Sequence, residues 1–214
     1  MSYYLFTLKD MLKTDDNPDG SYGESEIKAI LSDFSCPHNE DIQSFLRQRA
    51  LEFSKQSIAE TFLVYTEYKN KLVLAGYFTL ANKGFSVSTK PKQLSNRLRR
   101  RLAKFSMNAL NERVIRADHM FIPALLIAQL SKNFTNGYNK LITGDELLNL
   151  ALDQVKRAQS IIGGKVCYIE CEDKEFLINF YSDNGFVNFG KRKLEREEKT
   201  QYEGEYLVQM LKYI

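Results

Sequence analysis

The chain has 214 residues, of which 43% are apolar, 27% charged and 12% aromatic, and its formal net charge is +3. This composition is that of an ordinary globular protein that can bury one sizeable core. The net charge is too small by itself to indicate a nucleic-acid-binding protein, and no stretch approaches the ~18 uncharged apolar residues of a membrane span.

The first ten residues contain no basic region followed by an apolar segment and a small-residue cleavage site, so the sequence predicts no secretory signal. Three cysteines, an odd number without paired metal-ligand spacing, fit a reducing compartment better than a disulfide framework. We therefore expect a cytoplasmic protein with a single domain over residues 1–214. The pattern does not indicate its oligomeric state.

The first third of the chain shows clear periodicity. Residues 3–8 read as a strand, and Pro18 with the Asp19-Gly20 pair predicts an irregular turn after it. Asn39 or Asp41 can cap a helix, because apolar residues recur at helical spacing as far as position 53. Two strands follow at 61–68 and 72–79, and residues 69–71 join them as a hairpin.

The second half predicts a strand, a helix and further strands. An apolar run at 124–130 leads through a polar loop to Gly144, and a helical pattern occupies 145–155. After Gly163-Gly164, residues 165–171 suit a parallel partner of strand 124–132, with a right-handed connection. A helix at 174–183 ends at Asn184-Gly185, and strands at 186–190 and 206–212 flank a highly charged segment. The order predicts an α/β fold with a mixed sheet.

Residues 84–122 form a basic segment that we expect to be a helical insertion. Leu94, Leu98, Leu102 and Phe105 share one helical stripe, and most cations lie off it. The cations in question are Arg97, Arg99, Arg100 and Arg101. Either they are a solvated helix face laid on the core, or they are a contact surface for RNA or another acidic partner.

The turn before residue 145 predicts an anion site. The first amides of a helix have no internal partner and point outward, so a strand that leads through a glycine turn into a helix can hold a cofactor's phosphates. The three glycines of dinucleotide-binding turns are missing, and so is the Gly-Lys-Ser/Thr of nucleoside-triphosphate loops.

Three segments resemble the GNAT N-acetyltransferase superfamily. Residues 139–144, followed by Leu147-Leu148, resemble the Arg/Gln-x-x-Gly-x-Gly/Ala segment that binds acetyl-CoA, with Asn139 in place of Arg or Gln and Ile142 in place of the middle glycine. Residues 36–80, with Phe45-Leu46, Thr61 and Gly76-Tyr77, are similar to the opening of the toxin-like acetyltransferase subgroup. Residues 179–186 match the Phe-Tyr-x-x-x-Gly-Phe signature that closes the cofactor site.

The resemblance implies a GNAT fold, in which helices flank a central mixed sheet, and an acetyl-CoA cofactor. It implies direct attack of an acceptor amine on the thioester, with Tyr181 as general acid toward the departing thiolate; a phenol and a thiol have compatible acid strengths. It assigns the pantetheine arm and the pyrophosphate to main-chain groups of Leu130, Ser131, Lys132, Asn139, Lys140, Leu141, Ile142, Thr143, Gly144 and Asp145. Ile142 argues for a wider turn and weaker cofactor binding.

Other candidate residues have simpler interpretations. On residue type alone Tyr181 is a packed tyrosine, and Lys132 and Lys140 are as readily exposed side chains as phosphate ligands. Cys167 and Cys171 alternate on one face of a buried strand and are expected to act as small apolar residues. His38 and His119 are isolated, so we expect no metal site. Glu170 is either a base acting through water or an outward strand residue.

Several functions remain open on the sequence. The first is an N-acetyltransferase, toxin-like on aminoacyl-tRNA, with Arg97 to Arg101 facing the RNA and an antitoxin as partner. A protein amine or a small polyamine is an alternative acceptor. The second is a degenerate, non-catalytic acyl-CoA-binding module, which the lost middle glycine suggests.

Overall fold

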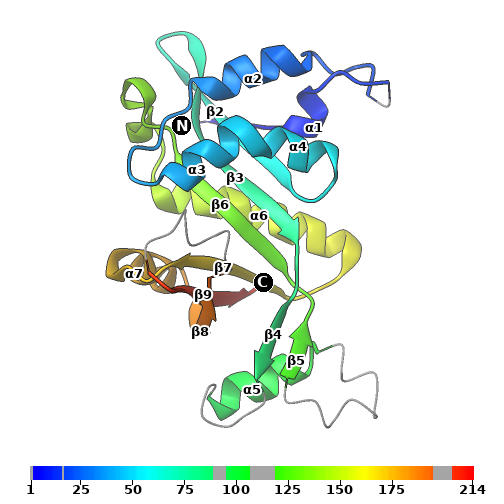
Figure 1. The fold of residues 1–214 in the computed structure, drawn as a ribbon, viewed down its shortest axis with the longest axis vertical. Helices are drawn as coiled ribbons and strands as arrows, with labels where there is room; N and C mark the ends of the chain where they lie inside the picture. Colours follow the sequence, from blue (N-terminus) through cyan, green and yellow to red (C-terminus); the bar gives the residue numbers. More distant parts are fainter. Residues whose placement is uncertain (1, 16, 89–94, 107–118, 195–203) are drawn as a thin grey trace. The chain divides into compact units, whose positions relative to one another are not determined.

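The structure is a computed structural model that describes residues 2–15, 17–88, 95–106, 119–194 and 204–214. The chain divides into two compact units, residues 1–81 with 127–153 and residues 82–126 with 154–214 (Figure 1). The prediction of a single domain stays a prediction. None of the described helices is both long and apolar enough to cross a membrane.

The first unit is built on β1 (Tyr3–Thr7), β2 (Glu60–Tyr68), β3 (Lys71–Asn82) and most of β6 (Leu125–Lys132). β2 pairs antiparallel with both β1 and β3. Lys69 and Asn70 join β2 to β3 with φ values of 51° and 61°. Two consecutive left-handed residues make a turn whose twist suits a two-residue hairpin, which explains the tight connection.

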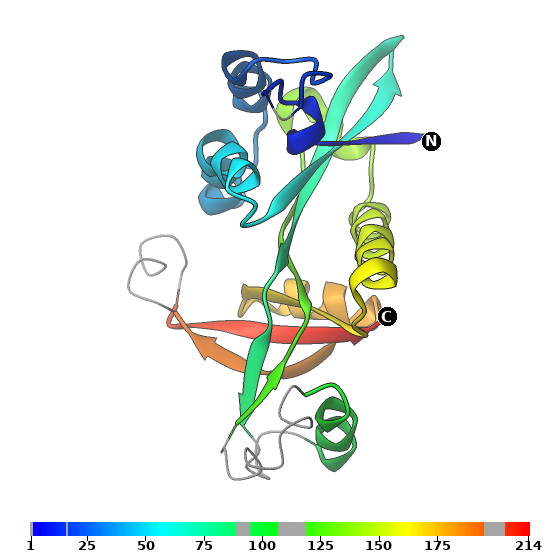
Figure 2. The ribbon, with the colours of Figure 1, turned by 90° about the vertical axis from the view of Figure 1, so that its right-hand side faces the viewer.

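Helices cover both faces of these strands, as Figure 2 shows. One face carries α1 (Leu8–Met11), α2 (Glu24–Ser32), α3 (Glu40–Ser44), a π-helical turn (Phe45–Arg49) and α4 (Ala50–Lys55), and the other carries the first half of α6 (Gly144–Ile162). The core of the unit lies under the first group of helices. Its fully buried side chains include Leu8, Ile27, Leu31, Phe34, Leu46, Leu63 and Tyr77.

Gly76 marks the closest approach of β3 to β6. A Cβ atom built at this position would lie 2.8 Å from the carbonyl oxygen of Ser131, which real Cβ atoms do not tolerate. The next residue, Tyr77, points to the helical face, where its hydroxyl donates to the carbonyl of Ile42 at 2.7 Å. Gly76 therefore allows the close spacing of β3 and β6, and Tyr77 fixes the position of α3.

The second unit is built on β7 (Val166–Glu172), β8 (Val187–Lys193) and β9 (Tyr206–Tyr213). β9 lies between the other two strands and pairs antiparallel with both. β6 joins β7 in parallel, and their register comprises two pairs, Leu125 with Cys167 and Leu126 with Tyr168. The unit also contains α5 (Asn96–Ala103), α7 (Glu175–Asp183), the end of α6 and an antiparallel pair of β4 (Phe85–Ser88) and β5 (His119–Ile122).

Most of the predicted elements are confirmed. Among the described residues one sheet has the strand order β1-β2-β3-β6-β7-β9-β8, and the parallel β6–β7 pair makes it mixed, as predicted. Asn39 caps the predicted helix, because its Oδ1 accepts from the amide of Ile42 at 3.1 Å. That helix is nevertheless interrupted by the π-helical turn, and α1 and α2 were not predicted.

The predicted basic insertion is only partly described. Its residues 89–94, including Leu94 of the predicted stripe, and 107–118 lie outside the described residues. The described part contains the predicted helix as α5, in which Leu102 is fully buried. It also contains the β4–β5 pair, which the helical pattern did not indicate.

Candidate functional site

Asn133 anchors the chain where it leaves β6. Its side-chain amide donates to the carbonyl of Leu74 at 2.9 Å, and its Oδ1 accepts from the amides of Ser35 and Thr135 at 3.0 and 3.1 Å. Its own amide donates to the carbonyl of Ala75 at 2.8 Å. The side chain is 2% exposed, so this one residue ties β3, the segment after α2 and the following loop together. Sequence reasoning missed it, because a single asparagine carries no pattern.

The predicted pantetheine residues Leu130, Ser131 and Lys132 form the end of β6. Ser131 is buried, and its hydroxyl donates to the carbonyl of Lys132 at 3.0 Å and contacts the sulfur of Cys36 at 3.4 Å. The register with β7 ends at Leu126, before this segment begins. The main-chain groups of Leu130–Lys132 are therefore not paired with β7.

The predicted pyrophosphate loop, residues 139–145, begins at the end of a compact helical turn. Thr135–Lys140 forms a 3-10 helix, in which Asn136 and Gly137 have left-handed φ values of 52° and 75°. The amide of Leu141 then donates to the carbonyl of Tyr138 at 2.9 Å. Asn139 is half-buried and Lys140 is exposed.

Ile142 fills the place where the resembling enzymes have a glycine, and its side chain is 2% exposed. The residue thus anchors the turn in the core. The amides of Ile142 and Gly144 donate to no other described residue. They are two of the predicted phosphate-binding donors that stay available in this loop.

Thr143 begins α6 as part of a capping box. Its amide and its hydroxyl both donate to Glu146 Oε2 at 2.8 Å, and its Oγ1 accepts from the amide of Glu146 at 3.1 Å. The hydrogen bond from the Thr143 amide is the main cause that lowers the pKa of the Glu146 carboxyl. The sequence carried this signal as Thr-x-x-Glu, which is typical of a helix start. One predicted phosphate donor, the amide of Thr143, is therefore already bound to a carboxylate of the chain.

Tyr181 lies in the last turn of α7, in the second unit, whereas all ten predicted cofactor residues lie in the first. Its ring is 9% exposed and contacts the rings of Phe180 and Phe186, with centroids at 5.0 and 5.5 Å. Its hydroxyl makes no hydrogen bond to another described residue. Burial, with a smaller contribution from Cys171, raises the pKa of Tyr181 well above its usual range. The side chain is therefore a neutral phenol that can give a proton but does not act as a base.

The turn after α7 supports the position of Tyr181. Gly185 has a φ of 81°, as its predicted C-cap role requires, and the amide of Phe186 donates to the carbonyl of Tyr181 at 3.0 Å. Lys212 Nζ donates to the carbonyl of Asn184 at 2.6 Å. The helix end is thus tied to β9.

The remaining candidates have structural partners. Burial raises the pKa of Cys167 to about 12 and that of Cys171 to about 11, so both remain neutral thiols in the strand. The carboxylate of Glu170 accepts from the guanidinium of Arg192 at 2.8 Å and from the side-chain amide of Gln209 at 2.8 Å. Glu170 therefore has structural partners in the sheet, and its role as a base that acts through water stays a prediction. Within the described ranges no cluster of His, Cys, Asp and Glu could hold a metal ion.

The predicted RNA-facing arginines lie on α5 and differ in their surroundings. Arg97, Arg100 and Arg101 are exposed. Arg99 donates to Asn96 Oδ1 at 3.0 Å, and the guanidinium carbon of Arg101 lies 3.5 Å from the ring centroid of Tyr213. Arg101 therefore packs on an aromatic ring, which leaves Arg97 and Arg100 as the cations of this helix that are best presented to a partner.

Solved structures share this architecture, although no protein-family model and no curated protein matches the sequence. A KacT variant with one tyrosine replaced by phenylalanine has a TM-score of 0.59 and 15% identity over 98% of this chain and 94% of that one. A variant of the toxin AtaT, bound to acetyl-CoA and the C-terminus of the antitoxin AtaR, has a TM-score of 0.57 and 15% identity over 99% and 92%.

AtaT complexed with acetyl-methionyl-tRNAfMet has a TM-score of 0.56 and 16% identity over 100% of this chain and 94% of that one. At sequence identities this low, the similarity concerns the fold alone. The chain therefore has the GNAT acyltransferase fold of these proteins over nearly its whole length.

Proposed function

We propose that the protein is an acetyl-CoA-dependent N-acetyltransferase whose acceptor is an amine. The observation that carries the proposal is the shared fold over nearly the full length of both chains, because AtaT with this fold has been solved with acetyl-CoA and with acetyl-methionyl-tRNAfMet. The Phe-Tyr-x-x-x-Gly-Phe segment adds independent support, since its tyrosine is a buried phenol with no hydrogen-bond partner among the described residues.

The residues of the chain fit such a cofactor at two places. The end of β6 offers main-chain groups at Leu130–Lys132, and the start of α6 offers the amides of Ile142 and Gly144 to a pyrophosphate. When bound, acetyl-CoA supplies the thioester from which the acetyl group passes to the amine. Lys132 and Lys140 would add positive charge beside the phosphates.

The role we assign to Tyr181 is to hold a proton at its hydroxyl oxygen and to give it to the departing sulfur. A raised pKa keeps that proton in place over the physiological pH range, but it also makes the phenol a weaker acid toward a thiolate than an ordinary tyrosine. The ring contacts with Phe180 and Phe186 hold the side chain in one orientation, which lowers the entropy lost when the proton is transferred.

We propose aminoacyl-tRNA as the acceptor and an antitoxin as a protein partner, by analogy with AtaT and its complexes. Arg97, Arg99, Arg100 and Arg101 of α5 would contact the RNA phosphates, and Arg97, Arg100 and Arg101 are the exposed members. A cytoplasmic location goes with this acceptor. A protein amine or a small polyamine is the alternative substrate.

One observation favours a second candidate, a degenerate acyl-CoA-binding module without catalysis. The carboxylate of Glu146 occupies the Thr143 amide, so a pyrophosphate at this helix start has to displace it or bind beside it. Binding would then be weaker than in a loop whose amides are all available.

The deciding experiment incubates the full chain with acetyl-CoA and charged tRNA and detects acetylated aminoacyl ends by mass spectrometry. The proposal predicts acetylation that depends on time, enzyme and acetyl-CoA. Calorimetric binding of coenzyme A without any modified acceptor would support the binding module. The absence of both binding and acetylation would refute both candidates.

A further inference from the structure

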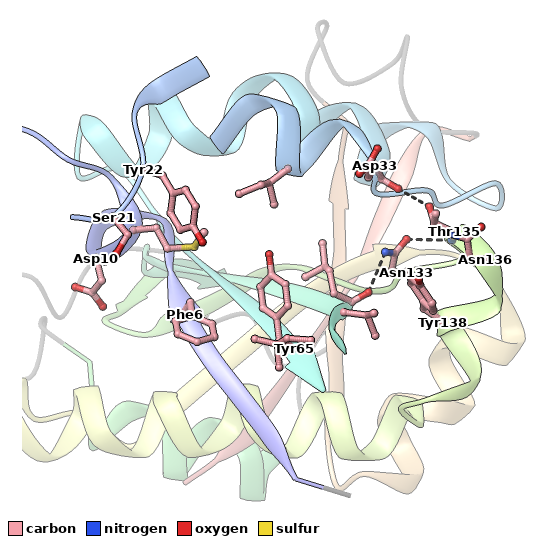
Figure 3. A pocket seen from close by; sticks show the side chains of 15 residues that line it. Phe6, Asp10, Ser21, Tyr22, Asp33, Tyr65, Asn133, Thr135, Asn136 and Tyr138 are labelled. Carbon is pink, nitrogen blue, oxygen red and sulfur yellow. Dashed lines mark hydrogen bonds between the residues drawn. The ribbon is translucent and has the colours of Figure 1, made fainter. Parts of the chain in front are cut away.

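A pocket of about 700 Å³ lies within the first unit, apart from the residues assigned above to acetyl transfer. It opens between the face of β1–β3 that carries α2 and the segment that follows β6 (Figure 3). Its size is that of pockets that enclose small ligands. The sequence did not predict it, because its walls come from four separate segments of the chain.

Aromatic rings form much of its wall. Phe6 of β1 and Tyr65 of β2 meet edge to face with centroids 5.6 Å apart. Figure 3 shows Tyr22 reaching into the same space from the opposite side, and Tyr138 closes the far end. Phe6 is 40% and Tyr22 is 38% exposed, so their apolar surface is left uncovered by the rest of the chain. Such rings offer negative π faces to a ligand.

The charge of the lining is of one sign. Among the described residues that line it, the charged members are Asp10 and Asp33, and none is a lysine, an arginine or a histidine. Figure 3 places the two aspartates at opposite ends of the pocket. Burial, with a smaller effect of Tyr22, raises the pKa of Tyr65 to about 12, so this phenol stays neutral and adds no charge. The charged residues in the described lining are therefore acidic, although the whole chain has a net charge of +3.

Both ends of the pocket are held in place by side-chain amides. At one end Asn17 Nδ2 donates to the carbonyls of Lys9 and Leu12 at 3.1 and 2.9 Å, which fixes the segment that carries Asp10. At the other end the bonds of Asn133 fix the segment after β6, and the hydroxyl of Thr135 donates to the carbonyl of Asp33. The walls are therefore preorganised, which lowers the entropy lost on binding a ligand.

We propose that this pocket binds a small organic cation, an ammonium group carried on an apolar body. The body would lie against the rings of Phe6, Tyr22 and Tyr65, and the ammonium would be attracted by the π faces and by the carboxylates at the ends. A neutral ligand would gain only the contacts of its apolar body with the rings. An anion would be repelled by the carboxylates. The site does not depend on the acetyl-transfer function proposed above.

The test uses three probes of similar size on the full chain, without coenzyme A: 2-phenylethylamine, 2-phenylethanol and 3-phenylpropionate. Titration calorimetry or ligand-observed NMR should give an affinity for the amine at least about tenfold higher than for the alcohol, and no measurable binding of the carboxylate. Raising the salt concentration should weaken the amine and leave the alcohol unchanged. Equal affinities for amine and alcohol, or no binding of the amine up to its solubility limit, would overturn the proposal.

Matched variants locate the site. Asp10→Asn and Tyr22→Ala change exposed lining residues, and each should weaken the amine several-fold. Glu67→Gln and Tyr4→Ala make the same kinds of change at exposed positions outside the lining and should leave the affinity unchanged. Equal losses in the lining variants and in their controls would show that the amine binds elsewhere, which also overturns the proposal. The binding experiments contain no coenzyme A, so their outcome does not depend on whether the protein transfers acetyl groups.

Discussion

The start of α6 and the end of α7 carry the two parts of the proposed chemistry, and their surroundings are opposite. The start of α6 is exposed, polar and already closed by the carboxylate of Glu146. The end of α7 buries Tyr181 among aromatic rings and leaves its hydroxyl without a partner in the described residues. The first arrangement therefore places a competing carboxylate beside a ligand's phosphates, whereas the second leaves a hydroxyl donor that a bound ligand can use.

We expect the largest effect from a change of Tyr181 at the end of α7. Tyr181→Phe should lower turnover by about 10²-fold to 10³-fold, because the general acid is lost, and should leave acetyl-CoA affinity and thermal unfolding nearly unchanged. Acetylation kinetics with titration calorimetry would measure this. Tyr206→Phe, the same change at an exposed tyrosine, is the control. Unchanged turnover in Tyr181→Phe would remove the role assigned to this residue.

A second prediction concerns Asn133, the buried residue that anchors the loop leading from β6 to α6. Asn133→Ala should lower the free energy of unfolding by about 3 kcal/mol, because it leaves the amides of Ser35 and Thr135 and the carbonyl of Leu74 without their buried partner. Urea unfolding followed by circular dichroism would measure it. Asn149→Ala, on the exposed face of α6, should change stability by less than about 0.5 kcal/mol. A loss of similar size in both variants would show that Asn133 is not the anchor.

A third prediction separates capping from cofactor binding at the start of α6. Glu146→Gln should tighten coenzyme A binding several-fold, because it removes a negative charge that competes for the Thr143 amide, and should cost about 0.5–1 kcal/mol of stability. Glu26→Gln is a matched control, since Glu26 accepts from the Gly23 amide at 2.7 Å at the start of α2. It should lower stability equally without affecting affinity. If both variants leave coenzyme A affinity unchanged, the pyrophosphate does not bind at this helix start.

The hydrogen bonds between Thr143 and Glu146 also predict that the stability depends on pH. Hydrogen bonds from Thr143 lower the pKa of Glu146 in the folded state, so its stabilising effect is complete above the unfolded pKa of ~4.3 and is lost as the pH falls through the folded value. The stability difference between the wild type and Glu146→Gln should therefore be largest near neutral pH and shrink on acidification. Unfolding curves at several pH values would measure it, and a difference that grows in acid would contradict the capping role.

The smallest effect concerns the proposed RNA contact. Arg97→Ala and Arg100→Ala should each weaken tRNA binding a few-fold and lower the slope of log affinity against log salt by about one. Arg157→Ala, at an exposed position of α6, should leave both quantities unchanged. Salt-dependent filter binding would compare the three variants. Identical slopes in all of them would exclude α5 as the RNA-binding surface.

The sequence predicted the elements whose patterns are strong and local. The hairpin, the β6–α6–β7 unit and α7 with Gly185 follow from alternation, helical period and glycine turns, and all are confirmed. α2 was missed because its two buried residues, Ile27 and Leu31, are too few to define a period beside a turn-rich segment.

The site was less predictable from the sequence than the fold. The Thr143–Glu146 capping box could have been read from the sequence, because its spacing is local. The bonds of Asn133, the ion pair of Glu170 with Arg192 and the aromatic pocket could not, because each joins residues far apart in the chain. The assignment of Tyr181 and of the cofactor residues stays a prediction.

The place of β9 in the second unit has a consequence for synthesis on the ribosome. β9 pairs with β7 on one side and with β8 on the other, although it is the last of the three to be translated. The earlier strands therefore wait with unpaired edges until residues 206–213 emerge from the exit tunnel. During that interval the nascent chain is most exposed to aggregation, and a chaperone would act on it most usefully then.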